Sequence, residues 1–382
     1  MLKPRLFSSL VLFSTLLALA AGMTLAQSGV RPKPTPTPAE QEDTEQVFVE
    51  EVRLPVFAYD EEGRFDPHLE IDDVLVVEDD VPQQVQSVRR VPASVLLLFG
   101  TGWDLNPVVR ADTTRDIGLR VLAGLRDGDM VAAVQYNGKP EVLQGWTAAR
   151  PEAARTIRAK LQSGKGSNLS LAIRRAVELL REQPVGNRHL VLVADGIDTA
   201  SSKEYEDAVK RLISAQTTLH VISYSEMGRR ELNKKWQRPK EAPGMTQSRA
   251  DMATVGIDPT RPPGMRGGGI NPHDVNTGVR FDPAMRRQRK AAEREMKRGD
   301  SRLKSLTEET GGRLLMPASV DEMVERGADV AREIGAQYVV TYKPKRPLRK
   351  AAATEYRRIH VGARKLGLRL RSRRGYVVGG MR

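Results

Sequence analysis

Cysteine is absent from this chain of 382 residues, and so are the common catalytic motifs. Without cysteine the protein forms no disulfide, carries no lipid-anchored cysteine and performs no thiol chemistry. There is no GxSxG elbow, no HExxH pair and no Walker loop, and the five histidines share no motif with one another. His189 and His220 fall in apolar stretches that predict buried strands, where a structural role is expected. We therefore expect that the protein is not an enzyme.

Long apolar runs are also scarce, because the chain has only one, near its start. A basic beginning, an apolar run over residues 6–20 and the small residues before Gln27 predict a secretory signal peptide over residues 1–26. The alternative, an uncleaved anchor helix, is less favoured because the run is shorter than the roughly 20 apolar residues that a bilayer requires. The sequence thus predicts an exported protein, periplasmic or extracellular, with no transmembrane segment in the mature chain.

Acidic residues are too few to balance the basic ones, so the formal net charge is +13. Residues 228–300 contain 17 Lys and Arg but only 9 Asp and Glu, and they are rich in Gly, Pro and Met. This composition predicts a basic, flexible insertion over residues 226–300. Nucleic acid is not expected as a partner, because the export signal and the absence of a base-stacking pattern argue against it. The open alternatives are a solvated loop and contact with anionic envelope polymers or lipid headgroups.

The remaining chain changes character along its length. From residue 92 apolar strands alternate with amphipathic helices, the helices being expected at 107–125, 151–161, 169–181 and 203–214. This alternation predicts an α/β fold: a doubly wound, mainly parallel sheet flanked by helices, with one antiparallel excursion near 129–146. The predicted divisions are a Pro-rich and acidic linker (27–46), a small β-module (47–91), the α/β domain (92–345) interrupted by the basic insertion, and a C-terminal basic β-hairpin and tail (346–382).

Three loops follow strands whose carboxyl ends meet at one edge of such a sheet: residues 100–104, 163–168 and 195–199. The sequence Gly-Thr-Gly at 100–102 has half of the dinucleotide fingerprint, but residue 105 is leucine where the third glycine should stand. Hard oxygen ligands are the alternative chemistry, and the candidate ligands of Mg²⁺ are Ser167, Asn168, Asp195 and Asp198. A purely structural role, with Asp195 capping the next helix, is also open.

Several stretches in order resemble the exported von Willebrand factor A-related family of Acidobacteria and similar soil bacteria. They are "DVLVVEDDVPQQVQSV", "LRDGDMVAAVQYNGKPEVLQGWT" and "LTEETGGRLLMP" with the closing "IGAQYVVTYKP", "RRIHV" and "GLRLRSRRGY". The resemblance covers residues 47–225 and 301–376. It implies a von Willebrand factor A fold and a metal-ion-dependent adhesion site, which is built from D-x-S-x-S after the first strand, a Thr on a second loop and a later Asp.

This chain departs from the implied adhesion site at its first motif. Ser167 stands at the Thr position and Asp195 at the late Asp, but the D-x-S-x-S positions fall on Gly100, Gly102 and Asp104, or one residue earlier on Phe99, Thr101 and Trp103. Neither register has the leading carboxylate. The hypothesis is therefore a degenerate site that holds no metal tightly and binds Mg²⁺ at most weakly.

The leading functional hypothesis is an exported, non-catalytic protein that binds a protein partner through this degenerate site. The residues expected to contact the partner are Thr101, Trp103, Asp104, Asn168 and Asp198, and those expected at the metal position are Ser167 and Asp195. The alternative is a structural envelope component that binds anionic polymer or lipid headgroups through its basic insertion. A hydrolase or a nucleotide-dependent oxidoreductase ranks third.

Overall fold

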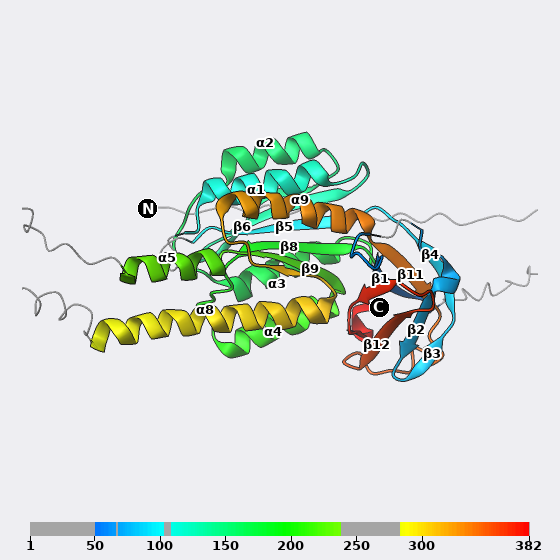
Figure 1. Ribbon diagram of the computed structural model, residues 1–382. Coiled ribbons are helices and arrows are strands. Elements are labelled where there is room, and N and C mark those ends of the chain that lie inside the picture. The colour runs from blue at the N-terminus through cyan, green and yellow to red at the C-terminus, as the bar shows by residue number, and fades with distance from the viewer. Residues whose placement is uncertain (1–49, 66–67, 103–107, 238–282, 382) are drawn as a thin grey trace, which may run out of the picture. The chain divides into compact units, whose positions relative to one another are not determined.

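A computed structural model describes residues 50–65, 68–102, 108–237 and 283–381. Its centre is a six-stranded sheet in which every pairing is parallel except the one between β6 and β7 (Figure 1). This arrangement confirms the predicted fold class, including the antiparallel excursion. In spatial order the strands are β10 (Leu314–Leu315), β9 (Thr217–Ser223), β8 (Arg188–Ala194), β5 (Ser94–Gly100), β6 (Met130–Tyr136) and β7 (Pro140–Thr147).

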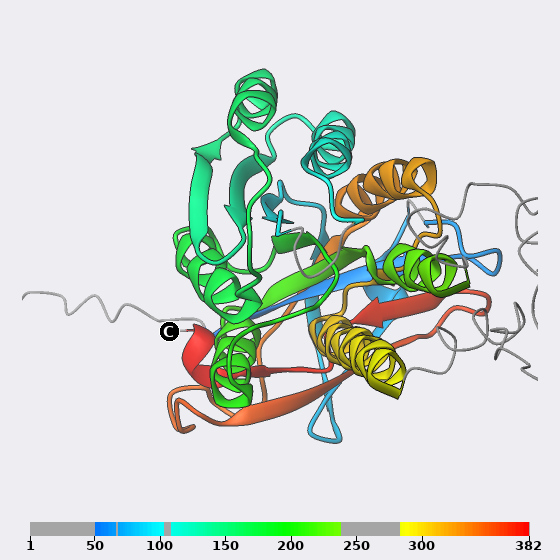
Figure 2. The ribbon, with the colours of Figure 1, turned by 90° about the vertical axis from the view of Figure 1, so that its left-hand side faces the viewer.

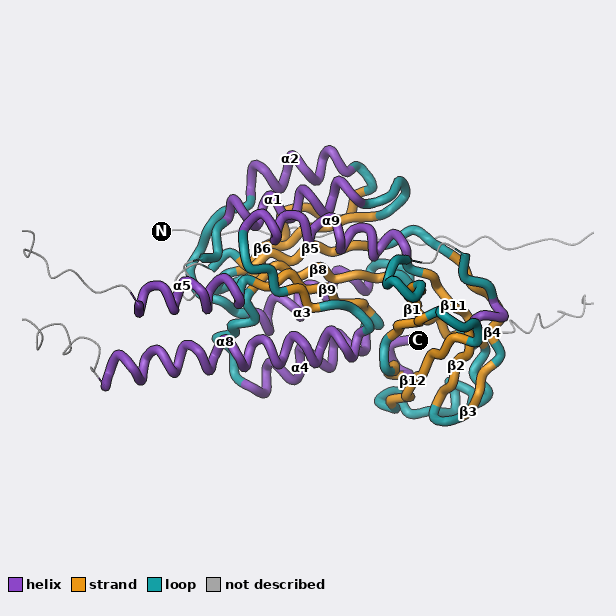
Figure 3. The backbone as a smooth tube through the Cα atoms, viewed as in Figure 1, coloured by secondary structure: helices purple, strands orange, loops and turns teal. Residues whose placement is uncertain are grey.

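Helices cover both faces of this sheet, as Figures 2 and 3 show. The core on one face includes Leu97 and Phe99 of β5, and the core on the other includes Leu96 and Leu98 of the same strand. Because successive side chains of a strand point to opposite faces, a fully apolar strand is what a doubly covered sheet requires. The first face packs against α1 (Ala111–Gly124), α2 (Arg150–Lys160) and α9 (Val320–Ala336), and the second against α3 (Leu169–Arg181), α4 (Ser202–Ser214) and α8 (Pro283–Thr310).

Helix boundaries follow local capping signals. The Asn168 side chain accepts a hydrogen bond from the Leu171 N–H at the start of α3, and Ser201 forms a capping box with Glu204 at the start of α4. Both helices begin within a residue of the prediction. The helix expected over 107–125 begins at residue 111, because residue 110 is extended. Residues 103–107 lie outside the described part.

A separate β-structure combines the beginning and the end of the described chain. Its first sheet has the order β13 (Arg369–Ser372), β1 (Val52–Tyr59), β11 (Tyr338–Tyr342) and β4 (Val85–Arg89). Its second has the order β14 (Gly375–Val377), β12 (Tyr356–Ala363), β2 (Val74–Glu78) and β3 (Val81–Gln83). Two short 3₁₀ turns, η1 (Ile71–Asp73) and η3 (Val378–Met381), adjoin these strands.

These strands pair across the predicted domain boundaries. β11 was expected to close the α/β domain, but it lies between β1 and β4, and the two strands expected to form a C-terminal hairpin pair with different neighbours: β12 with β2 and β14, β13 with β1. The physical reason is burial. A few hairpin strands cannot enclose a core alone, and the strands from both ends of the chain supply one shared core.

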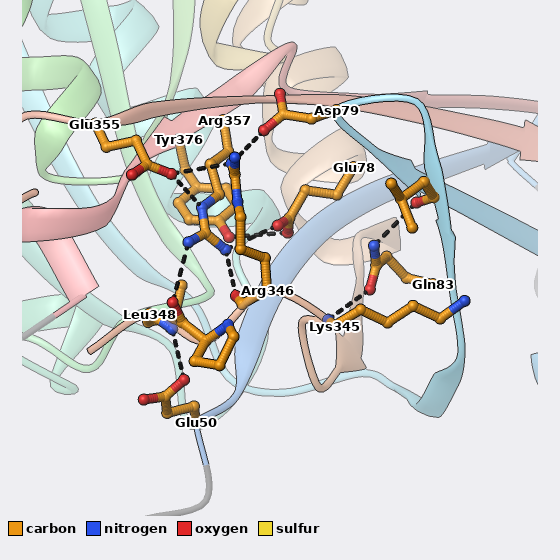
Figure 4. A network of polar contacts seen from close by, with 12 residues as sticks. Glu50, Glu78, Asp79, Gln83, Lys345, Arg346, Leu348, Glu355, Arg357 and Tyr376 are labelled. Carbon is orange, nitrogen blue, oxygen red and sulfur yellow. Dashed lines mark hydrogen bonds and ion pairs between the residues drawn. The ribbon is translucent and has the colours of Figure 1, made fainter. Parts of the chain in front are cut away.

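A buried polar network joins these strands (Figure 4). Glu78 accepts hydrogen bonds from the hydroxyls of Tyr342 at 2.7 Å and Tyr376 at 2.9 Å, and from the Arg357 guanidinium at 2.9 Å. Arg357 also donates to the Arg346 carbonyl at 2.7 Å. Because this guanidinium is fully buried, its charge depends for compensation on two carboxylates, Glu78 and Glu355, each 2.9 Å away.

Candidate functional site

The three loops predicted to converge do meet at the edge where the parallel strands end. We call this the upper edge and define it as residues 100–102, 163–168 and 195–199. A β-bridge pairs Gly102 with Gly164, whose N–H donates to the Thr101 carbonyl at 3.0 Å. The Thr199 N–H and hydroxyl both donate to the Ser167 carbonyl, at 2.8 and 2.7 Å. Backbone hydrogen bonds therefore hold the loops against one another.

Close backbone approach explains the second glycine of the Gly-Thr-Gly sequence. A Cβ atom added to Gly102 would lie 1.9 Å from the Gly166 carbonyl oxygen, so no other residue fits without moving that loop. The glycine brings two chain segments together, which is a sufficient reason for its presence and does not require a bound phosphate.

Ser167 and Asp195 lie in the same loop cluster, as their predicted roles require. Both are nearly buried, with exposed fractions of 8% and 6%. The Ser167 hydroxyl donates to the Ile197 carbonyl at 2.7 Å, and an Asp195 carboxylate oxygen accepts the Ile197 N–H at 3.1 Å. Their metal-binding role remains a prediction.

Asn168 and Asp198 lie at the N-terminus of α3 and stabilise it. Besides the Asn168 cap, Asp198 accepts the Ser170 N–H at 3.1 Å, the Ser170 hydroxyl and, with its other oxygen, the Ala200 N–H at 3.0 Å. These bonds tie the 195–199 loop to the helix that begins beside it. Contact of either side chain with a partner is still a prediction.

The other predicted contact residues divide into one buried and two outside the described chain. Thr101 is 1% exposed, and its hydroxyl donates to the Tyr136 carbonyl at 3.3 Å. Trp103 and Asp104 lie outside the described residues.

Strand register bears on which residue, Phe99 or Gly100, stands at the position of the leading Asp of D-x-S-x-S. Phe99 is level with Val193 in the neighbouring strand, so side-chain alternation places Thr101 and Asp195 on the same face as Phe99. This favours the alignment in which the carboxylate position is Phe99. The Phe99 ring is fully buried beneath α1, and a Cβ added to Gly118 would lie 2.6 Å from it.

The alternative alignment, on Gly100, meets a second aromatic ring. A Cβ added to Gly100 would lie 3.0 Å from the Tyr136 hydroxyl and 3.1 Å from the Ala194 Cβ. Tyr136 is 1% exposed, and among the described residues its hydroxyl has no partner that meets the geometry of a hydrogen bond. Burial, and then the charges of Asp195 and Asp198, raise the pKa of this hydroxyl well above its usual range; the Ser167 hydroxyl offsets part of that shift.

Sequence reasoning missed Tyr136 and also Tyr224. The Tyr224 hydroxyl forms a 2.8 Å hydrogen bond with the Thr114 hydroxyl, and burial raises its pKa. Each tyrosine stands at or just after the end of a strand of the central sheet, and that position was the available signal. The charge of Asp195 contributes to raising the pKa of both tyrosine hydroxyls.

The described residues do not fit a tightly held cation. Among them no group of three His, Asp or Glu side chains is placed to bind a metal ion. The Asp198 carboxylate accepts hydrogen bonds from the Ser170 and Ala200 N–H groups, and the hydroxyls of Thr101 and Ser167 donate to backbone carbonyls. With Asp195 this set lacks the leading carboxylate of the adhesion site that the resemblance implies, which lowers its expected affinity for Mg²⁺.

Both ends of the predicted basic insertion pack on the rest of the molecule. α5 (Ser225–Gln237) follows β9, and α8 crosses the 195–199 loop, where a Cβ added to Gly299 would lie 3.2 Å from the Asp195 carbonyl oxygen. An ion pair between Arg229 and Asp300 joins the two helices, and Leu303 is fully buried. Deleting residues 228–300 would therefore disturb the upper edge as well, and would not separate the two functional hypotheses.

Comparison with known proteins identifies the domain. The family model for the von Willebrand factor type A domain matches residues 110–254, so the chain contains such a domain. No curated protein matches the chain. In the part of the chain that the structure describes, no helix is long and apolar enough to cross a membrane.

Solved structures similar in fold have low sequence identity. A von Willebrand factor type A protein from Catenulispora acidiphila is 9% identical, over 87% of this chain and 75% of that one, with a TM-score of 0.41. An aerotolerance-related membrane protein from Bacteroides fragilis is 13% identical over 63% and 98%, with a TM-score of 0.36. BatB from Bacteroides thetaiotaomicron is 16% identical over 34% and 65%, with a TM-score of 0.30, so this chain spans less than two thirds of that protein.

Proposed function

We propose that this chain is a non-catalytic module that binds a protein partner through the upper edge of its von Willebrand factor type A domain. The observation that carries the proposal is the interlocking of three loops by backbone hydrogen bonds, such as those from Gly164 to Thr101 and from Thr199 to Ser167. A surface already ordered before binding loses little conformational entropy when the partner docks. Ile197 and Thr199 are at least partly exposed there.

Binding is favoured over catalysis by where the titratable groups lie. Ser167 donates its proton to a carbonyl and has no base within hydrogen-bond distance among the described residues. His189 is buried near the beginning of β8 and His220 in the middle of β9, whereas Asp195 follows the end of β8. General-base activation of a nucleophile requires direct contact or one water, and this separation prevents it.

We propose further that the site binds its partner without a tightly held metal, with at most weak Mg²⁺ binding. Phe99 occupies the position of the leading carboxylate and Tyr136 occupies the space beside Gly100. Export to the periplasm or the cell exterior is part of the proposal and depends on the signal peptide expected at residues 1–26, which lie outside the described chain.

The test uses a surface variant that leaves the loop backbone intact. The double substitution Lys165→Glu and Ile197→Arg changes two side chains that reach solvent on the upper edge. The control, Glu182→Arg, alters an exposed residue at the other end of α3. Each chain is cross-linked in envelope extract, and the captured proteins are quantified by mass spectrometry.

We expect the double variant to lose at least about tenfold in capture of the proteins that the parent and control chains retain. Equal capture by all three chains, with unchanged thermal stability, would contradict binding through the upper edge.

A further inference from the structure

We propose that the outward face of α8 docks an acidic polypeptide segment of the partner that binds at the upper edge. This inference rests on the proposed function and names the chemistry of the partner. Four cations carry it, Arg287, Lys290, Arg294 and Lys297, which we call the basic stripe.

The basic stripe is a row along one face of the helix. Its members are spaced by three, four and three residues, so they project from the same side of α8 over about 15 Å. All four are exposed. Neighbouring acidic residues, Glu293 and Glu295, fall on the flanks of this row.

The stripe is not neutralised by the described part of the chain, in which none of its members forms an ion pair. Other cations of the same helix are engaged: Arg298 pairs with Glu295 at 3.1 Å, and Arg302 stacks on the Tyr205 ring at 4.7 Å. Four adjacent like charges repel one another, and an anionic partner would relieve that repulsion.

The opposite face of α8 fixes the direction of the stripe. Met296, Gly299, Leu303 and Leu306 are buried and recur at the helical period. We call these four residues the buried seam. At about 100° per residue the seam lies roughly opposite to the stripe. A Cβ added to Gly196 would lie 2.7 Å from the Leu303 Cδ1, so the seam is seated on the loop that follows Asp195.

The nearest member of the stripe, Lys297, therefore lies within one turn of the anchor at Gly299, and a partner that covers the 195–199 loop has α8 beside it (Figure 1). Electrostatic complementarity of this kind increases the association rate and orients the partner.

An acidic polypeptide fits this face better than a membrane does. Helices that bind bilayers insert an apolar face beside their cations, but the apolar residues Met296, Leu303 and Leu306 are buried inside this protein. Exposed residues beside the stripe include Ala291, Arg298 and Ser301, none of them a large apolar side chain. Carboxylates carried on a chain can match successive cations along the helix without any insertion.

The experiment measures binding of a short fluorescein-labelled poly-glutamate peptide by fluorescence anisotropy, at low and at physiological ionic strength. The stripe variant is Lys290→Glu, Arg294→Glu and Lys297→Glu. The matched control, Arg155→Glu, Arg158→Glu and Lys160→Glu, makes the same change in net charge at exposed positions of α2. Vesicles of phosphatidylglycerol are a second probe, and the upper-edge variant Lys165→Glu with Ile197→Arg is tested in parallel.

We expect the stripe variant to bind the peptide about tenfold more weakly than the parent, with the difference shrinking as salt rises, and the control to stay within about twofold. Failure of the parent to bind the peptide, an equal loss in the control, or stronger parental binding to the vesicles would each overturn the inference. Failure of the proposed function is distinguishable, because it appears as undiminished capture from extract by the upper-edge variant, whatever the peptide result.

Discussion

Phe99 and Tyr136 determine the character of the site around Asp195. The Phe99 ring is buried beneath α1, and the Tyr136 hydroxyl lies beside Gly100 in the space that a side chain there would need. The surviving hydroxyls of Thr101 and Ser167 are held by backbone carbonyls.

Added metal should therefore have little effect on stability. Millimolar Mg²⁺ or Mn²⁺ is expected to change the unfolding midpoint by less than about 1 °C, because a weakly bound ligand stabilises the folded state only when its concentration exceeds its Kd. Differential scanning fluorimetry with and without chelator measures this. A clear upward shift that disappears in Asp195→Ala would show that a metal binds there.

A second group of residues, two buried histidines on β8 and β9, makes stability depend on pH. His189 and His220 contact each other at 3.2 Å and are fully buried. Burial lowers the pKa of His189 to about 3, and burial, His189 and two nearby arginines lower that of His220 well below its usual range.

Below about pH 6.5 the two histidines bind protons in the unfolded chain but stay neutral in the folded protein. The free energy of unfolding is therefore full above pH 6.5 and decreases as the pH falls toward 3. The expected loss is about 1.4 kcal/mol per pH unit for each histidine. Urea unfolding at several pH values between 4 and 7 measures the slope. His189→Gln should reduce it, and an unchanged slope in that variant would mean that the ring is not held neutral.

At the scale of elements, the packing of α8 on the upper edge depends on two glycines in contact. Gly196 has φ +75°, and a Cβ added to it would lie 2.7 Å from Leu303 Cδ1 and 3.1 Å from Gly299. Both the conformation and the space exclude a side chain.

Gly196→Ala should lower the free energy of unfolding by at least about 2 kcal/mol and loosen α8. Gly145→Ala in β7 is the control, since a Cβ there meets nothing within 4 Å. Chemical denaturation gives the energy, and hydrogen exchange of α8 amides reports the loosening. Equal stability of the two variants would contradict the packing described.

Across the whole molecule, the two ends of the described chain depend on each other through Glu78 and Arg357. Their 2.9 Å ion pair is buried, and the hydroxyls of Tyr342 and Tyr376 complete the coordination of the carboxylate. Removing Arg357 leaves the buried Glu78 carboxylate without an opposing charge, whereas Arg357 itself also pairs with Glu355.

Arg357→Leu is therefore expected to cost about 3–5 kcal/mol in the free energy of unfolding. Arg358→Leu removes an arginine from the next position, whose ion pair with Asp80 is exposed, and should cost less than about 1 kcal/mol. Urea denaturation of both variants makes the comparison. Similar losses would mean that the network does not stabilise the β-structure.

Local patterns were sufficient for the helices and strands of the central sheet. The helical period of residues 169–181 and the capping residues Asn168 and Ser201 act within a few positions of one another, so they can be recognised without a fold. The meeting of Ser167 and Asp195 was also predictable, because the carboxyl ends of parallel strands share one edge.

Three features were not predictable in this way: the position of Tyr136 beside Gly100, the packing of α8 on the loop after Asp195, and the strands that pair with β11. Tyr136 acts on the site only because β6 places it level with Gly100, and β11 looks like any other strand until its neighbours β1 and β4 are known. The contact of Gly299 with Gly196 joins positions more than one hundred residues apart.

The sequence by itself determined the alternation of strands and helices, the missing leading carboxylate and the basic character of residues 228–300, because these are properties of residue type and short-range order. Only the tertiary structure decided that Phe99 and Tyr136 are buried at the ends of β5 and β6, that α8 packs on the loop after Asp195 with its basic stripe exposed, and that both ends of the described chain share one core. Those outcomes depend on contacts between distant segments, whose geometry is set by the packing of the whole core and not by any local pattern.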